Sequence, residues 1–355
     1  MLETPLPVTI AMIINQHTEA FLRRSRGCVR VASLISEANF DELVDVEVPE
    51  LEKIKIEYKK KVHEEDGFTL WNYAISREIR GEQIRGSFLA LQKGNFVFLI
   101  TGFSPSFLRN CIMYIAKQLY PDIMVAYITT EEINQILGNF SENKGTKLFY
   151  SKYVAKKVFG ERETALGYGH KVYTDAFKKA VETRPRLWID SISVFSENNV
   201  DVEFRLGRQG ILTYHKGNFQ EYYEHVLSKI ADYSGERLKI FEKRGRRETE
   251  EKEVHPLLIQ YNSRVFEEQI ARKQLIDVIS NYDFCNFSVI HNGNPHVYLN
   301  IVDRVDNSTF SLRTYGTDSL VIAPQVKTSR ASLMRFSKHL QDRFQEGTIS
   351  EFEAQ

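Results

Sequence analysis

The sequence predicts an α+β protein made of tandem two-layer units, each an antiparallel β-meander packed against flanking helices. Short runs of alternating apolar and polar residues come in clusters with Gly, Asn and Asp turns between them, which is typical of antiparallel strands. Each cluster is followed by apolar residues at three- and four-residue spacing, which indicates an amphipathic helix. Hydrophobic residues make up 42% of the 355 residues, enough for packed cores in two or three domains.

The balance of charge limits the possible classes of function. The chain carries 47 basic and 47 acidic side chains, so its formal net charge is zero. This neutrality excludes a uniformly basic nucleic-acid coat and an acidic mimic of nucleic acid, but it is compatible with a basic patch on one face. The apolar content excludes an intrinsically disordered protein.

The cysteines and the first residues bear on the compartment. Cys28, Cys111 and Cys285 form no CxxC pair, which excludes a disulfide framework and a zinc ribbon. Each lies among apolar residues, as a free core cysteine does, and we expect a reducing cytoplasm. The apolar run 6–14 lacks a basic leading region and is too short to span a bilayer. We therefore expect a buried strand or a strand–helix start there, and no membrane.

The C-terminal part of the chain shows the predicted unit most clearly. Strand-like alternation covers residues 257–261, 284–290, 296–302, 308–313 and 320–323. Apolar residues at helical spacing predict one helix at 265–279 and another that begins at a Ser329 N-cap and ends at Gly347. The order is therefore β-α-ββββ-α. Burial of each helix's apolar stripe on the apolar face of the meander gives a two-layer sandwich.

The rest of the chain follows a similar order. In the middle we predict strands and helices at 148–155, 172–181, 188–195, 200–206, 211–214 and 219–233. Nearer the N-terminus, a hairpin at 88–100 precedes a helix at 107–119. The three closing helices begin near Ser104, Asn218 and Ser329. A spacing of about 110 residues corresponds to one compact unit each time.

The order β-α-ββββ-α resembles one half of the TATA-binding protein fold. The resemblance lies in topology alone, without a shared motif, so it implies a fold and no functional residues. Runs of charge mark the boundaries, with residues 243–253 as the best linker and 141–145 as a weaker one. We predict an N-terminal unit at 1–145, a middle unit at 146–245 and a C-terminal unit at 254–355.

A basic stretch in the middle unit is the most informative chemical feature. Between Lys147 and Arg186 there are ten lysines or arginines, only four acidic residues, and four interleaved tyrosines. This composition is typical of a surface that follows a phosphate backbone and stacks bases. The cations that we assign to this surface are Lys152, Lys156, Lys157, Lys171, Lys178, Lys179, Arg184 and Arg186. A solvated face, or a contact with an acidic protein, explains the same composition.

Two smaller groups of cations are further candidates for phosphate contacts. Arg205 and Arg208 lie on a glycine-punctuated strand pair, and they would contact an anion if the outer face of that meander is a binding surface. Arg335 and Lys338 are three residues apart on the last predicted helix, so they share a face. An ordinary turn and a solvated helix face are the alternative interpretations.

Catalytic patterns are weaker. Residues 167–171 place two glycines and a lysine before a helix, as a phosphate cradle would, but without the spacing of a P-loop. Asp190, Asp201 and Glu203 on neighbouring predicted strands would allow a divalent-metal nuclease site, although no lysine follows at the spacing such a nuclease needs. Acids on the solvent face of a sheet give the same pattern.

A pair of histidines is the remaining candidate for a metal site. His291 and His296 flank an Asn-Gly turn and would need Asp303 or Asp306 as a third ligand. A hairpin turn explains the same residues, and no second close pair accompanies them. We therefore expect no metal and no cofactor.

These patterns favour a nucleic-acid or nucleoprotein binding accessory protein that acts within a larger complex, for which genome defence is a fitting context. We expect DNA or RNA and a protein as partners, and no active site in this chain. The alternatives are a metal-dependent nuclease, a phosphate-ester enzyme around 167–171, and a purely protein–protein interaction module. The expectation depends on cations that gather on one side and are not neutralised by the chain's own carboxylates.

Overall fold

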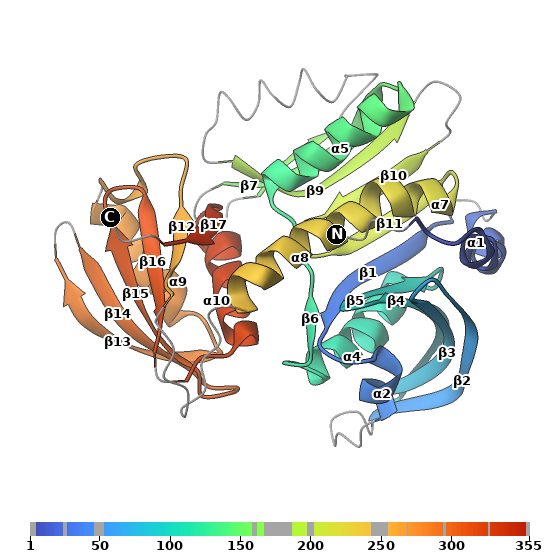
Figure 1. The fold of residues 1–355 in the computed structure, drawn as a ribbon, viewed down its shortest axis with the longest axis horizontal. Helices are drawn as coiled ribbons and strands as arrows, with labels where there is room; N and C mark the ends of the chain where they lie inside the picture. The colour runs from blue at the N-terminus through green and yellow to red at the C-terminus, as the bar shows by residue number, and fades with distance from the viewer. Residues whose placement is uncertain are drawn as a thin grey trace. The chain divides into compact units, whose positions relative to one another are not determined.

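The computed structural model describes residues 5–23, 27–45, 53–157, 162–166, 187–196, 202–242, 255–267, 269–293, 296–325 and 327–352. The protein belongs to the α+β class, with helices packed on antiparallel sheets (Figure 1). It divides into two compact units. The first unit holds most residues up to Ser234, and the second holds Gly235–Gln355 with two short segments from the middle of the chain. No helix in the described ranges is long and apolar enough to cross a bilayer.

One sheet organises the first unit. Its strands run in the order β2-β3-β4-β5-β1-β11-β10-β9-β7-β8, and β6 pairs with β1 off this path. The central strand β1 pairs with both β5 and β11, so strands from residues 1–145 and 146–245 share one sheet. The strands are β1 Val29–Ser36, β2 Ile54–Glu65, β3 Phe68–Ile79, β4 Glu82–Lys93, β5 Phe96–Thr101, β6 Ile123–Val125, β7 Leu148–Lys157, β8 Arg162–Leu166, β9 Leu187–Ser196, β10 Glu203–Gly207 and β11 Ile211–Lys216.

Helices pack on both faces of this sheet. On one face Phe204 of β10 contacts Phe140 of α5 and Tyr222 of α7. On the other face the α3–α4 segment packs on the apolar residues of β1, β3, β4 and β5, and β2–β5 curl around α4 (Figure 1). The helices are α1 Val8–Leu22, α2 Phe40–Asp45, α3 Pro105–Phe107, α4 Met113–Gln118, α5 Thr130–Lys144, α7 Phe219–Tyr222 and α8 Ser228–Glu242, of which α8 belongs to the second unit from Gly235 onward.

Two N-terminal expectations change in the structure. The apolar run 6–14 forms the beginning of helix α1, in which Ile10, Ile14 and Thr18 are buried at four-residue spacing. The weak linker at 141–145 is instead the end of α5, where Gly145 closes the helix with a φ of +56°. The stronger linker at 243–253 and the helix at 172–181 lie outside the described residues.

The three predicted helix starts are confirmed. Ser104, Asn218 and Ser329 are N-caps whose side-chain oxygens accept hydrogen bonds from backbone N–H groups of the first turn. The first two helices are less regular than expected, because each contains a π-helical segment. These segments are η2 Leu108–Ile112, between α3 and α4, and η3 Tyr223–Leu227, between α7 and α8. One wider turn changes the apolar spacing too little to be visible in the sequence.

The second unit confirms the predicted order β-α-ββββ-α. Its sheet has the order β13-β14-β15-β16-β12-β17, with α9 and α10 on one face. The short strand β17 was missed, because four residues after a glycine show no clear alternation. The elements are β12 Leu257–Gln260, η4 Val265–Glu267, α9 Gln269–Ser280, β13 Cys285–Asn292, β14 Val297–Asp303, β15 Thr309–Tyr315, β16 Ser319–Pro324, α10 Arg330–Arg343 and β17 Thr348–Glu351.

The same order also occurs in the first unit. Strand β1 is followed by α2, by the four strands β2–β5 and by the α3–α4 segment. The first strand lies beside the last in both places, since β1 pairs with β5 and β12 pairs with β16. The middle segment departs from this arrangement, because its last strand β11 pairs with β1 rather than with β7.

The packing of α10 makes the stability of the second unit sensitive to pH. The ring of His339 stacks on Tyr282 with 4.2 Å between centroids, and its Nε2 lies 3.0 Å from the carbonyl oxygen of Val278. Burial lowers the pKa of His339 from its ordinary value of 6.5. The unfolded state therefore binds the proton more readily, so this stabilisation is complete above pH 6.5 and is lost as the pH falls through the folded pKa.

We expect the unfolding free energy of the His339→Gln variant to depend less on pH than that of the wild type. The measurement is urea unfolding of both proteins between about pH 7.5 and 5.5, one unit either side of an ordinary histidine pKa. The wild type should lose more of its unfolding free energy over this interval than the variant does. Equal losses in the two proteins would contradict the prediction.

Candidate nucleic-acid interface

The structure describes only the beginning of the predicted basic stretch. Lys152 is exposed on β7, as expected for a surface contact. Lys156 and Lys157 end the same strand, but their side chains lie outside the described residues. Also outside them lie Lys171, Lys178, Lys179, Arg184 and Arg186. The gathering of these cations on one surface therefore stays a prediction.

Arg205 belongs to a row of polar side chains that crosses four strands of the first unit. Register pairs Ser193 on β9 with Arg205 on β10, Arg205 with Thr213 on β11, and Thr213 with Arg30 on β1. Paired positions share a face of the sheet, so these four residues form one line, which we call the polar row. Neighbouring strands are about 4.8 Å apart, which separates the two arginine backbones by about 10 Å.

The polar row faces away from the helices α5 and α7. Side chains alternate along β10, so Arg205 points to the side opposite its neighbour Phe204. Phe204 is the residue that contacts Phe140 of α5 and Tyr222 of α7. Arg205 is exposed, and Ser193 and Thr213 beside it are half-buried. The row is therefore open to a ligand at Arg205, while beyond Arg30 the same face is covered by the α3–α4 segment, which packs on Ala32 and Leu34 of β1.

Both arginines of the row are held by neutral partners. Arg205 donates a hydrogen bond from Nη2 to Oγ of Ser191 at 2.7 Å. Arg30 is half-buried and donates from Nη1 to the carbonyl oxygen of Phe103 at 2.6 Å. Neither guanidinium forms an ion pair with a carboxylate among the described residues. The row thus places two positioned cations on one face, Arg205 exposed and Arg30 half-buried, and Arg30 is a member that sequence analysis missed.

Arg208 occupies a different environment from Arg205, which corrects the expectation that it lies on an outer binding face. Its side chain is 0% exposed. Its backbone N–H donates to the carbonyl of Asp190 at 2.9 Å, and by alternation its side chain shares the face of Phe204. This is the face that the helices cover, so Arg208 is part of the interior. The sequence does not show which side of the strand is covered.

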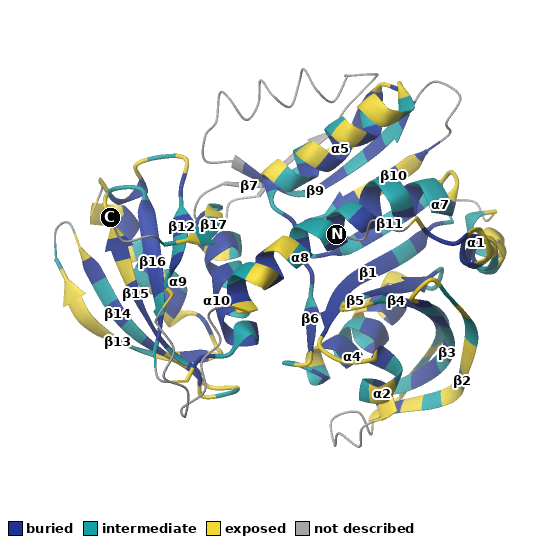
Figure 2. Cartoon of the chain, in the orientation of Figure 1, coloured by how far each residue is buried: buried dark blue, intermediate teal, exposed yellow. Residues whose placement is uncertain are grey.

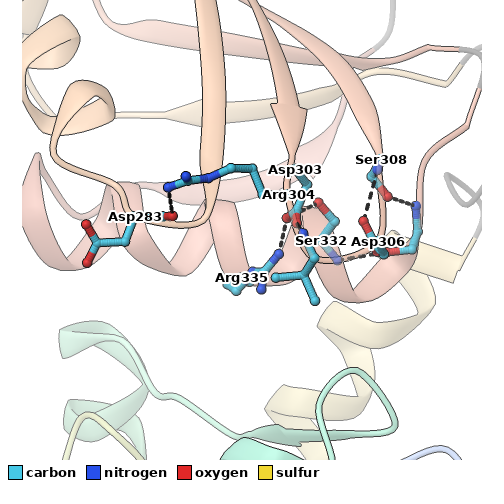
Figure 3. A network of polar contacts seen from close by, with 9 residues as sticks. Asp283, Asp303, Arg304, Asp306, Ser308, Ser332 and Arg335 are labelled. Carbon is cyan, nitrogen blue, oxygen red and sulfur yellow. Dashed lines mark hydrogen bonds and ion pairs between the residues drawn. The ribbon is translucent and has the colours of Figure 1, made fainter.

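Arg335 belongs to a polar network of the second unit rather than to a binding surface (Figure 3). Asp303 at the end of β14 is 1% exposed and accepts hydrogen bonds from Arg335 and, at 2.7 Å, from Oγ of Ser332. Its other oxygen accepts the N–H of Val305 at 2.8 Å. The Arg335 side chain is only 15% exposed. Its charge is neutralised by the chain itself, which corrects the expected phosphate contact, and Lys338 on the same helix is half-buried.

The described acids of the nuclease alternative lie apart. Glu203 stands opposite Phe195 on β9, whereas Asp190 lies five positions away on that strand. Because side chains alternate along a strand, Asp190 and Glu203 also point to opposite faces of the sheet. Asp201 and the glycine-rich residues 167–171 lie outside the described residues.

The other candidate chemical groups do not assemble either. His291 and His296 are exposed near the β13–β14 turn, while Asp303 is held in the network with Arg335. In the described part of the chain, no three His, Cys, Asp or Glu side chains come together as metal ligands. The cysteines are free and buried. Burial raises the pKa of Cys111 and Cys285 to about 11, so these thiols are protonated at neutral pH.

Sequence analysis missed one further surface, on the sheet of the second unit. The face directed away from α9 and α10 carries Tyr298, Arg313 and Tyr315, with Phe352 beside them. The available signal was the period-two placement of these side chains, out of phase with the buried Leu299 and Leu312. Alternation alone shows that a face is solvated, and it does not distinguish a binding face from an ordinary one.

No protein-family model matches this chain, and no curated protein matches it. Its function therefore has to be inferred from its own residues.

Proposed function

We propose that this protein binds nucleic acid as an accessory subunit of a larger nucleoprotein assembly, in a reducing compartment such as the cytoplasm. The observation that carries the proposal is the polar row, in which Arg30 and Arg205 lie on one face without carboxylate partners. A guanidinium group presents paired N–H donors that match the oxygens of a phosphate. Hydroxyl groups such as those of Ser193 and Thr213 are common additional donors to a phosphate backbone.

The position of the row in the sheet supports the same function. Strand β9, which carries Ser193, has β7 as its other neighbour. The basic stretch begins on β7, where Phe149 stacks on Phe195 of the row's face, so alternation directs the exposed Lys152, three residues later, to the opposite face. The later residues of the stretch follow along the chain, and they are the cations that a phosphate backbone bound to Arg30 and Arg205 would need in addition.

Arg205→Ala tests the proposal directly. We expect a several-fold loss of affinity for a labelled oligonucleotide and a salt slope, in log Kd against log salt, that is smaller by about 0.7–0.9, because one phosphate contact is lost. Arg85→Ala is the control, since it removes an arginine that is 63% exposed on β4 and ion-paired with Glu57. Equal affinities for Arg205→Ala and the wild type at low salt would contradict the proposal.

A further inference from the structure

The sheet of the second unit has an inner face that packs on helices and an outer face that does not. On the inner face, Phe310 of β15 contacts Phe336 of α10, and Leu299 and Leu312 are fully buried. Tyr298 precedes Leu299 on β14, and Arg313 follows Leu312 on β15. The two are paired in register, so both point to the outer face. Buried residues alternate with half-buried and exposed ones along β14 (Figure 2).

Aromatic rings gather around an arginine on this outer face. The Tyr315 ring meets the Phe352 ring edge-on, with 5.2 Å between centroids. The guanidinium carbon of Arg313 lies 5.8 Å from the centroid of Phe352, and Tyr298 stands opposite Arg313 on the neighbouring strand. Tyr315 is 46% exposed. We call Tyr298, Arg313, Tyr315 and Phe352 the aromatic platform.

Neutral residues dominate the strands around the platform, and one carboxylate, that of Asp318 in the β15–β16 turn, accepts a hydrogen bond at 2.8 Å from Ser319, which stands opposite Tyr315. None of the outward positions on the strands β12–β17 is a carboxylate, although the chain has 47 acidic residues in all. The accessible outward side chains that can donate or accept hydrogen bonds include those of Gln260, Ser288, Asn300, Thr309 and Thr348, whereas Ser311 and Ser319 are buried. The face thus combines the exposed Tyr315 ring, the half-buried rings of Tyr298 and Phe352, one cation and neutral polar groups.

The first unit contains the same strand order, and there the corresponding face of the sheet serves for packing. There the face of β3 and β5 directed away from α3–α4 carries Phe68 and Phe98, which contact Tyr223 of η3. In the second unit the corresponding face is polar and aromatic, and no described helix covers it. The same strand order thus gives a covered face in one place and, in the other, a face that is exposed at Arg313 and Tyr315 and buried at Val321 between them and β12.

We propose that the aromatic platform binds single-stranded nucleic acid by stacking unpaired bases on Tyr298 and Tyr315, with Arg313 placed for a phosphate or a base plane. This inference rests on the proposed function and specifies its ligand. Stacking needs bases that are free of a duplex, because paired bases expose only their edges. Single-strand binding surfaces combine rings that stack bases with cations that follow the backbone, and the platform supplies the rings and one such cation. The rings favour a ligand with planar faces over an acidic protein, and an apolar helix would need a less polar surface.

Tyr315→Ala is the central test, with a labelled oligothymidylate of about 20 nucleotides and a duplex of mixed sequence as probes. We expect affinity for the single strand to fall at least about fivefold, and affinity for the duplex to stay within about twofold. Tyr315→Phe keeps the ring and should bind as the wild type does. The control is Tyr58→Ala, because Tyr58 on β2 is also 46% exposed but lies on the first unit.

The outcomes separate this inference from the proposed function. If the wild type binds neither probe, the proposed function fails and the platform fails with it. If the wild type binds and Tyr315→Ala keeps full affinity for the single strand, the inference that the aromatic platform binds single strands is wrong, while the proposed function stands. An equal loss for both probes would also overturn base stacking. Should Tyr315→Ala lower the urea midpoint, Tyr298→Leu, which keeps apolar bulk without an aromatic ring, carries the same test.

Discussion

Replacing Asp303 by alanine is expected to lower the unfolding free energy of the second unit by about 3–5 kcal/mol. The change leaves the largely buried guanidinium of Arg335 without its carboxylate, and it removes the acceptor of the Ser332 hydroxyl and of the Val305 N–H. An uncompensated buried charge and two unsatisfied donors account for the size of the effect. Urea unfolding followed by circular dichroism measures it.

Two further variants show whether the charge itself is responsible. Asp283→Ala removes an exposed carboxylate near the network (Figure 3). Arg304 donates a hydrogen bond to the backbone carbonyl of Asp283, not to its carboxylate, so this variant should change the unfolding free energy by less than about 0.5 kcal/mol. The double variant Asp303→Leu with Arg335→Met removes both charges and should be more stable than Asp303→Ala. A loss below about 1 kcal/mol for Asp303→Ala would show that Arg335 finds solvent or another partner.

Gly210→Ala is expected to destabilise the first unit strongly. Gly210 has a φ of +67°, and an added Cβ would lie 2.2 Å from the carbonyl oxygen of Ala126 and 3.1 Å from that of Ser33. The positive φ alone costs about 1–2 kcal/mol for alanine. The clash adds to this cost because the backbone atoms involved are fixed by hydrogen bonds, from the Ser33 N–H to Gly210 and from the Ala126 N–H to Ser33.

Gly94→Ala is the matched control for this prediction. Gly94 also has a positive φ, +52°, but an added Cβ would meet no atom within 4 Å. Gly94→Ala should therefore lower the unfolding free energy only by the conformational cost of about 1–2 kcal/mol, and Gly210→Ala should lower it distinctly more. Equal unfolding free energies for the two variants would contradict the close approach of Gly210 to Ala126.

Local signals predicted the second unit and the helix starts. Alternation and turn residues define the strands β13–β16, and the side chains of Ser104, Asn218 and Ser329 cap their helices without help from distant residues. The pairing of β1 with β11 was not predictable in this way. The two strands lie far apart in sequence, β1 is buried at nearly every position while β11 alternates, and nothing in either one specifies its neighbour in the sheet.

The candidate site was predicted less well than the fold, because sequence shows where charges are but not what they meet. Arg205 is exposed and Arg208 is buried, although only two residues separate them on the glycine-punctuated segment. Arg335 is neutralised by Asp303, which precedes it by about 30 residues and reaches it only through the packing of α10 on the sheet. Burial and ion pairing depend on tertiary contacts, which a count of cations does not contain.

Equilibrium titration of the whole chain with a labelled single strand, across a series of salt concentrations, tests nucleic-acid binding most directly. The two arginines of the polar row alone predict that log Kd rises with log salt with a slope of about 1.4 or steeper, and cations of the basic stretch would increase it. Absence of binding at about 50 mM salt, or an affinity that does not change with salt, would contradict phosphate contact by this protein.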